Sequence, residues 1–271
     1  MKHKFLTLVL SLVAVMGVQR AMAWGIFAHG AIVYVTEQHL TPEAKAKCRY
    51  YLKHTLPYHS TWMDFWRGVE KYKDINNPHT IREDANGRLA WLDTDRPKGG
   101  VMGHLKSALE ELGNGNYKNL PDSVVRQRII NMLHYVPDMH CPVHVKLHDY
   151  PAGSRKIYRN GKRANLHGFW DGAPSFQRKG WTFEQYAAEV DKVSPKQVKK
   201  WVKGSLDDWG RDCIKCAHRA NEITPHGCDL ATFTKEQNEA VLELADEAAM
   251  MAAYRLAHLL NTFFRVFPRF C

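Results

Sequence analysis

Histidine and aspartate recur in this sequence at spacings that would place them together. The densest run is 133–144, where His134 and Asp138 are four residues apart and His144 follows six residues later. A helix carries residues four apart on one face. Pro142 would end that helix and let His144 fold back toward it. Imidazole and carboxylate groups gathered in this way are typical ligands of hydrolytic metal sites.

Two further segments repeat this combination of residue types. His167 and Asp171 are again one helical turn apart, and Asp64 precedes His79 by fifteen residues. A single pair of this kind is more often a hydrogen-bonded surface pair, but several in one chain predict a shared metal site. Other histidines are expected to be ordinary surface or core residues: His39, His54, His59, His104, His140, His148, His218, His226 and His258.

The first residues have the features of a secretory signal. Lys2 and Lys4 form a charged start, Phe5 to Val18 an apolar stretch, and Ala21-Met22-Ala23 a small-residue cleavage site. We therefore predict a signal peptide over 1–23, a single domain over 24–271, and a secreted or periplasmic location.

Cleavage after Ala23 would make Trp24 the first residue, five positions before His29. A free amine and the carbonyl oxygen of the same residue chelate a metal, which an internal tryptophan cannot do. Trp24 and His29 are thus predicted to complete the metal site.

Length, charge and apolar composition limit the number of domains, the kind of partner and the chance of a membrane span. About 248 residues are left after cleavage, enough for one large domain. Loss of three basic residues lowers the formal charge from +10 to +7, which fits either a solvated basic surface or attraction to a polyanion such as nucleic acid. Charged residues interrupt the apolar stretch 240–264, so it is expected to be a buried core helix and no membrane span is predicted.

Six cysteines in an exported chain permit disulfides. The simplest local pairing is Cys216 with Cys228. The alternative is a cysteine-rich zinc site that includes Cys213, but no second CxxC follows.

The apolar pattern is helical almost throughout and predicts one all-α, multi-helix domain. Thr234-Lys235-Glu236-Gln237 has the form of a capping box, and Asn160-Gly161 predicts a short hairpin. Loops are expected at 73–100, 113–121, 142–166 and 223–233. The expected helices are 26–39, 42–55, 60–72, 101–112, 122–141, 182–193, 195–204, 206–222 and 234–264.

The sequence resembles the zinc-dependent single-strand nucleases of the S1/P1 type over essentially all of 24–271. Nine positions carry the resemblance by order and spacing: Trp24, His29, Asp64, His79, His134, Asp138, His144, His167 and Asp171. The resemblance implies an all-α fold with a trinuclear zinc site.

It also implies which residues hold each Zn²⁺ ion. The first would be held by Asp64, His79, His134 and Asp138, and the second by His144, His167 and Asp171. The third would be held by the amine and carbonyl of Trp24, by His29 and by a bridging Asp138. Zinc ions close together activate water at neutral pH and stabilise a departing oxygen.

Asp64, Arg67 and Asp138 are the expected catalytic residues, with Arg67 contacting the phosphate as its counterpart does in the family. The acid that usually orients this arginine is replaced by Arg82, so Glu83 or Asp84 is left as its substitute.

Several other residues in the ligand segments could have a structural role instead of a functional one. Pro137 should kink the ligand helix, and Cys141 is either a buried packing thiol or a disulfide partner. Tyr135, Phe169 and Trp170 are candidates for stacking on nucleobases, which would favour unpaired strands. Core packing is the expected role for at least one of them.

The resemblance implies an exported, monomeric endonuclease that hydrolyses single-stranded DNA and RNA to 5′-phosphorylated products. Nucleotides are a further expected substrate, through 3′-nucleotidase activity. Two alternatives remain: a zinc-dependent phospholipase C, and a non-catalytic protein that binds zinc or nucleic acid.

Overall fold

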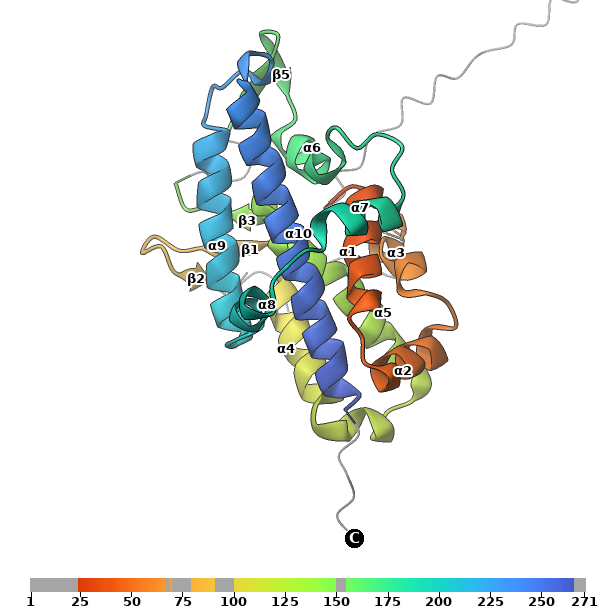
Figure 1. Cartoon of the computed structure of the whole chain (residues 1–271). Helices are drawn as coiled ribbons and strands as arrows, with labels where there is room; N and C mark the ends of the chain where they lie inside the picture. The colour runs from red at the N-terminus through yellow and green to blue at the C-terminus, as the bar shows by residue number, and fades with distance from the viewer. Residues whose placement is uncertain (1–23, 67–68, 70–78, 91–99, 150–154, 266–271) are drawn as a thin grey trace, which may run out of the picture.

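The chain folds into a body of helices with a few short strands. The structure, a computed structural model, describes residues 24–66, 69, 79–90, 100–149 and 155–265. Helices account for most of these residues (Figure 1), which confirms the all-α class. The α-helices are α1 (Ile26–Gln38), α2 (Pro42–Leu52), α3 (Trp62–Phe65), α4 (Gly100–Leu112), α5 (Asp122–His140), α6 (Leu166–Asp171), α7 (Phe183–Val190), α8 (Pro195–Trp201), α9 (Leu206–Ile223) and α10 (Lys235–Phe263).

The longest helix, α10, runs through the middle of the body, and α1, α5 and α9 pack against it (Figure 1). It begins with the predicted capping box, in which Thr234 Oγ1 accepts from Gln237 N and Gln237 Oε1 accepts from Thr234 N. Most of its residues from Val241 onward are buried, as expected for a core helix. None of the described helices has the length and apolar character needed to cross a membrane.

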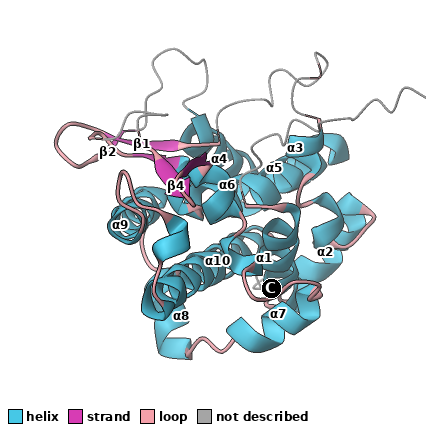
Figure 2. Cartoon of the chain, turned by 90° about the horizontal axis from the view of Figure 1, so that it is seen from above, coloured by secondary structure: helices cyan, strands magenta, loops and turns pink. Residues whose placement is uncertain are grey.

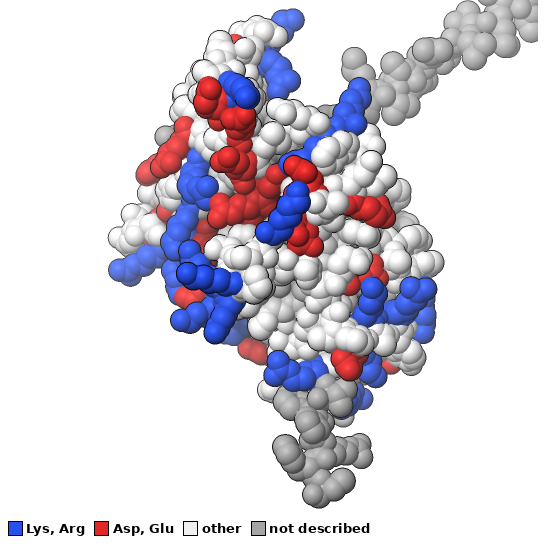
Figure 3. Space-filling model, in the orientation of Figure 1, with Lys and Arg blue, Asp and Glu red and all other residues white. Residues whose placement is uncertain are grey.

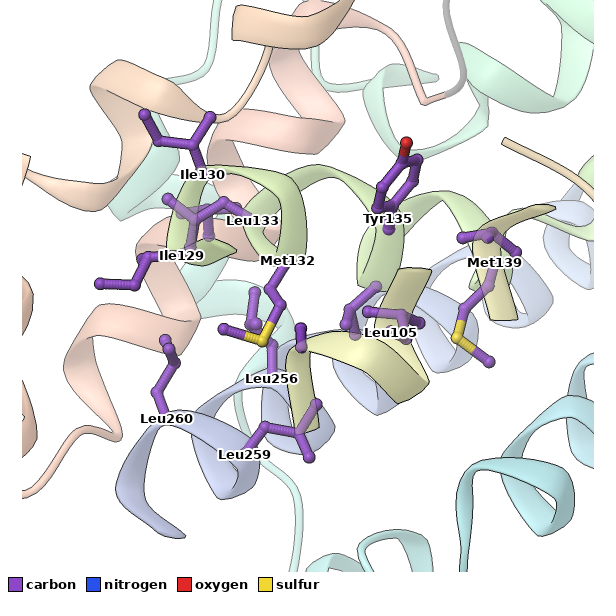
Figure 4. Packing of buried hydrophobic residues seen from close by; sticks show 14 of the residues in the cluster. Leu105, Ile129, Ile130, Met132, Leu133, Tyr135, Met139, Leu256, Leu259 and Leu260 are labelled. Carbon is purple, nitrogen blue, oxygen red and sulfur yellow. The ribbon is translucent and has the colours of Figure 1, made fainter. Parts of the chain in front are cut away.

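Helix α5 carries the ligand segment through the interior. All its residues from Ile129 to His140 are buried, as expected for a helix that is apolar on most sides. Its apolar side chains pack against Leu105 of α4 and against Leu256 and Leu260 of α10 (Figure 4). The polar residues of α5 are consequently held in a rigid, water-poor environment.

Two prolines shape the end of α5. The helix continues through Pro137, so the kink expected there does not interrupt it. It ends at His140, Cys141 is extended, and Pro142 opens a short 3-10 turn, Pro142–His144. The predicted end of the helix before Pro142 is thus confirmed.

Three short strands form a sheet that the sequence did not predict. They are β1 (Ile81–Glu83), β2 (Leu89–Ala90) and β3 (Val145–Lys146), in the order β2-β1-β3. Figure 2 shows the short strands gathered at one edge of the helical body. Strands β1 and β3 are parallel, with Ile81 opposite Val145. This register brings His79, just before β1, beside His144, just before β3.

The predicted hairpin at Asn160-Gly161 is confirmed. It pairs β4 (Ile157–Arg159) with β5 (Lys162–Ala164). The turn residues have φ of 53° and 71°, the left-handed values that a type I′ turn needs. Helix α6 follows the hairpin directly.

The other predicted helices agree with the observed ones to about three residues at each end, with two exceptions. Within the predicted 60–72 helix only α3 (Trp62–Phe65) is observed, and residues 67–68 and 70–72 lie outside the described part of the chain. A 3-10 turn, Leu56–His59, precedes α3. Helix α6 was not predicted; it extends from the end of the expected loop and is capped by Asn165.

The predicted Cys216–Cys228 disulfide is wrong. The five cysteines in the described part of the chain are all free thiols, and Cys271 lies outside it. Helix α9 continues for seven residues past Cys216, about 10 Å along the axis. The loop that follows is bonded to β4, where Tyr158 N donates to Cys228 O. The alternative zinc site at Cys213 is not formed among the described residues either.

Candidate metal centre

Histidine, aspartate and cysteine side chains from distant parts of the chain form three neighbouring groups. In each group the potential ligand atoms lie within 4.8 Å of one another, and every member is buried. The groups are His29, His134 and Asp138; Asp64, His79 and His134; and Cys141, His144 and Asp171. They come from α1, α3, the start of β1, the end of α5, the turn after it, and α6.

Asp138 lies at the centre of this arrangement and is completely buried. Its Oδ1 is 3.0 Å from Nε2 of His29, while its Oδ2 is 2.7 Å from Nδ1 of His79 and 3.2 Å from Nε2 of His134. Its two oxygens therefore face different histidines. This is the arrangement a carboxylate needs in order to connect two metal ions.

His134 is fixed by a backbone hydrogen bond that leaves its other nitrogen facing the carboxylates. Nδ1 donates to the carbonyl of Ser60 at 3.0 Å, and Nε2 lies 3.7 Å from Oδ1 of Asp64. Burial alone would lower the pKa of His134, but Asp138 and Asp64 raise it to about 9. His134 and His79 in turn hold the pKa of Asp138 well below its usual value, despite the opposing effect of burial.

His144 is oriented in the same manner. Its Nδ1 donates to the carbonyl of His79 at 2.9 Å, and its Nε2 is 2.9 Å from Nε2 of His167. His167 Nε2 is also 3.1 Å from Oδ2 of Asp171. Burial lowers the pKa of His144 to about 3, so this imidazole is neutral and already in the form that binds metal.

Cys141 belongs to the same region. Its thiol is fully buried and donates to Oδ1 of Asp171 at 3.4 Å. Burial and the charge of Asp171 raise the pKa of this thiol well above its usual value. The expectation of a buried packing thiol is confirmed, the disulfide alternative is not, and the thiol in addition contacts a predicted ligand. Cys141 lies three residues before His144 in the sequence, and this spacing could have identified it as a further neighbour of the metal ligands.

The main chain at Trp24 reaches the cluster from the other side. Gly25 N donates to the carbonyl of Asp171 at 2.9 Å. The indole of Trp24 is completely buried, and its Nε1 donates to the carbonyl of Pro137 at 2.8 Å. That carbonyl lies in the last turn of α5, where the helix itself supplies no donor. The indole thus ties the start of α1 to the ligand-bearing end of α5.

The donors fit a divalent metal. Both nitrogens of His29 and both oxygens of Asp138 are buried, yet none completes a hydrogen bond of good geometry within the described chain. Buried polar atoms are normally satisfied, so a ligand is the simplest partner for these four. Nitrogen and oxygen donors at these positions suit zinc with open coordination positions.

A buried arginine supports the end of α5 from behind. Arg255 of α10 donates to Nε2 of His140 at 2.9 Å, to the carbonyl of Trp201 at 2.8 Å and to Oδ2 of Asp212 at 2.6 Å. His140 in turn donates from Nδ1 to Val136 O at 2.8 Å. Burial and then Arg255 lower the pKa of His140 to about 3. His140 is thus structural, as predicted, whereas the role of Arg255 was not foreseen.

The structure brings together Trp24 and all eight predicted ligand side chains, but it does not support the predicted acidic partner of Arg67. Arg67 lies outside the described residues. The two carboxylates offered as its partner are engaged elsewhere: Glu83 accepts from His218 and from His148 N, and Asp84 accepts from the backbone of Asn86 and Arg88.

For the aromatic candidates for base stacking, the alternative of core packing is confirmed in all three cases. Tyr135, Phe169 and Trp170 are buried in the core, because α5 and α6 turn these faces inward. The exposed aromatics next to a ligand are Phe65, 79% exposed, and Trp66, 38% exposed, directly after Asp64. Because Phe65 and Trp66 directly follow the predicted ligand Asp64, the sequence could have identified them as aromatics near the site.

Replacing the central carboxylate tests whether Asp138 connects two metal ions. Asp138→Asn removes the charge and one acceptor, so bound metal per chain should fall and the affinity of the remaining ions should drop by more than the 10- to 100-fold typical of an outer-shell partner. Elemental analysis after dialysis measures this. Asp122→Asn, on the exposed first turn of α5, is the matched control; equal metal content in both variants would refute the central position.

The raised pKa of His134 predicts how the stability of the metal-free chain varies with pH. A histidine whose pKa is higher in the folded chain than in the unfolded chain stabilises the folded chain. This stabilisation is fully present below pH 6.5, the ordinary pKa of histidine, and is lost above about pH 9, the pKa of His134 in the folded chain. Metal-free protein should therefore lose stability between these values, while metal affinity rises because protons compete less. Urea unfolding of chelated protein measures the first effect. His134→Gln should flatten the profile; a wild-type profile that is already flat contradicts the pairing.

The comparison with known proteins agrees with this geometry. Residues 24–265 match the family model described as S1/P1 Nuclease, which spans all of the clustered ligands. No match among curated proteins was found. The family match covers most of the chain, and the chain therefore belongs to the S1/P1 nuclease family.

Proposed function

We propose that this chain is an exported zinc-dependent endonuclease. It hydrolyses phosphodiester bonds of single-stranded DNA and RNA to 5′-phosphorylated products and removes 3′-phosphates from nucleotides. The observation that carries the proposal is the buried Asp138, with its two oxygens directed at histidines of two different groups, in a chain of a nuclease family.

The proposed ligands are the nine residues named from the sequence, holding three zinc ions. Bound zinc would supply an activated water at neutral pH and positive charge for the phosphate. The chain's own part is positioning. Asp138 presents one oxygen to each side, and His134 and His144 are locked by backbone carbonyls. Burial keeps bulk water from these groups and strengthens their electrostatic effect.

Export and cleavage after Ala23 belong to the same proposal. The charged start, apolar stretch and small-residue site of residues 1–23 support it, and the family match begins at Trp24. The main chain of Trp24 lies beside Cys141 and Asp171, where a free amine would meet the cluster. The mature protein would act outside the cytoplasm, secreted or periplasmic, as a monomer.

Preference for unpaired strands is assigned to the exposed aromatics beside Asp64. A base of a single strand is free to stack on a ring, whereas a base inside a duplex is not. Phe65 exposes most of its ring, and Trp66 lies next to it with ring centroids 6.2 Å apart. We propose that the ring of Phe65 stacks on the base next to the cleaved phosphate.

The two alternatives predict different substrates. A phospholipase C would hydrolyse phosphatidylcholine, and a non-catalytic protein would turn over neither lipid nor nucleic acid. Membership of a nuclease family supports the nuclease.

Turnover by protein that begins at Trp24 tests the proposal. Zinc-loaded protein should cleave single-stranded DNA and RNA, lose activity with a chelator and regain it with zinc, and leave phosphatidylcholine intact.

A tag fused upstream of Trp24 should abolish most turnover while the circular dichroism spectrum stays unchanged, because the Trp24 nitrogen is then an amide. Full activity of the tagged protein would contradict the role of the terminus, and lipid turnover alone would contradict the nuclease.

Removing the Phe65 ring tests the stacking role. Phe65→Ala should lower kcat/KM on single-stranded DNA by about 5- to 150-fold, the equivalent of about 1–3 kcal/mol of stacking. On a strand with an abasic residue beside the cleaved phosphate the same variant should lose little. Tyr50→Ala, an exposed aromatic on α2, is the matched control. An equal loss on normal and abasic strands would show that Phe65 does not stack on a base.

A further inference from the structure

The metal centre is open to solvent on one side. Among the clustered ligands, His167 has the most exposed side chain, at 33%, whereas those of Asp138, His134 and His79 are 0–3% exposed. His167 lies in the first turn of α6. A phosphate that reaches the cluster on this exposed side would lie next to α6 and near the segment that precedes it.

That segment is the β4–β5 hairpin, and it is strongly basic. Arg159, Lys162 and Arg163 are all exposed, and β5 ends only three residues before His167. The hairpin forms the tip of the body at β5 in Figure 1, and Figure 3 shows Lys and Arg side chains at this tip. On the same face, Asp and Glu gather over α9 and α10 (Figure 3). The charge contrast favours a polyanion along the hairpin.

None of these cations is held in a close salt bridge within the described chain, although the pKa of Asp229 is lowered by backbone N–H groups of the turn and, to a smaller extent, by Arg159. No ion pair within 4.0 Å joins Arg159, Lys162 or Arg163 to another described residue. Asp229, in the loop after α9, accepts backbone hydrogen bonds from Asn160 and Gly161 of the hairpin turn and from Ala231. Its carboxylate is thus occupied in holding the turn.

The arrangement works against stability. Arg159 and Lys162 are directly opposite each other across the two strands, and like charges in such pairs are destabilising. The hairpin is nevertheless held firmly: Ile157 is completely buried, Gly227 N donates to Lys156 O and Tyr158 N donates to Cys228 O. A firmly held hairpin that presents opposed cations, with Asp229 as a partial counter-charge to Arg159, is suited to binding an anionic ligand.

We infer that Arg159, Lys162 and Arg163 of the β4–β5 hairpin bind the phosphates of a polynucleotide strand that flank the cleaved bond. This inference rests on the proposed function and deepens it: the hairpin would make the enzyme favour long strands over dinucleotides, whose only phosphate lies at the metal centre.

The inference is tested with a triple variant, Arg159→Gln, Lys162→Gln and Arg163→Gln, in the zinc-loaded protein. At about 0.1 M salt, kcat/KM on a long single-stranded oligonucleotide should fall roughly 10- to 100-fold, and the slope of log(kcat/KM) against log[salt] should become shallower by about 2. Turnover of a dinucleotide should be unchanged, and Tm should be equal or higher because the opposed charges are gone.

Lys196→Gln, Lys199→Gln and Lys200→Gln on α8 form the matched control. These residues are also exposed, and α8 lies at the opposite end of α9 from the hairpin (Figure 1). Wild-type kcat/KM and salt slope in the hairpin variant would overturn the inference, as would an equal loss in the α8 variant or an equal loss on the dinucleotide.

The failure of the proposed function would be visible separately. If wild-type protein hydrolyses neither the oligonucleotide nor the dinucleotide, the nuclease proposal fails. Fluorescence anisotropy with the uncleaved oligonucleotide then tests the hairpin. Weaker binding by the hairpin variant alone supports the inference, and equal binding by wild type and both variants overturns it.

Discussion

A buried negative charge at Asp138 is the constraint on which the rest of the structure depends. An ionised carboxylate inside a helix that is apolar on most sides is costly unless opposite charges surround it. His134 and His79 lower the pKa of Asp138 against the effect of burial and so favour its ionised form, and His29 faces its other oxygen. The folding of α1, the β1–β3 pairing and the turn after α5 all bring imidazoles to this one carboxylate, and the same gathering creates a candidate metal centre.

Rigid packing on the far sides of α5 keeps these groups in place. Leucine and methionine side chains lock the helix against α4 and α10 (Figure 4), and Arg255 holds its last turn through His140. The indole of Trp24 fastens the start of α1 to the same turn. Ligand geometry is therefore set by the core and by backbone carbonyls, which is the support that a preorganised site requires.

Much of the fold and of the ligand set was readable from the sequence because the signals were local. Caps such as Thr234 and apolar periodicity located the long helices, Asn160-Gly161 located the hairpin, and the four-residue spacing of His134 and Asp138 located the centre. The β1–β3 pairing was missed because strands of two or three residues have no periodicity and their partners are far apart in the chain. The sequence left Tyr135 and Trp170 open between core packing and base stacking, because their burial depends on how the whole helix is rotated against the core.

The central claim, that Asp138 and its surrounding ligands hold three metal ions once Trp24 is the first residue, is tested most directly by counting and locating zinc. The measurement is elemental analysis of protein that begins at Trp24, together with anomalous X-ray diffraction at the zinc edge from its crystals. The account predicts three zinc ions per chain, two of them in contact with Asp138. A single ion, or ions located away from Asp138, would contradict it.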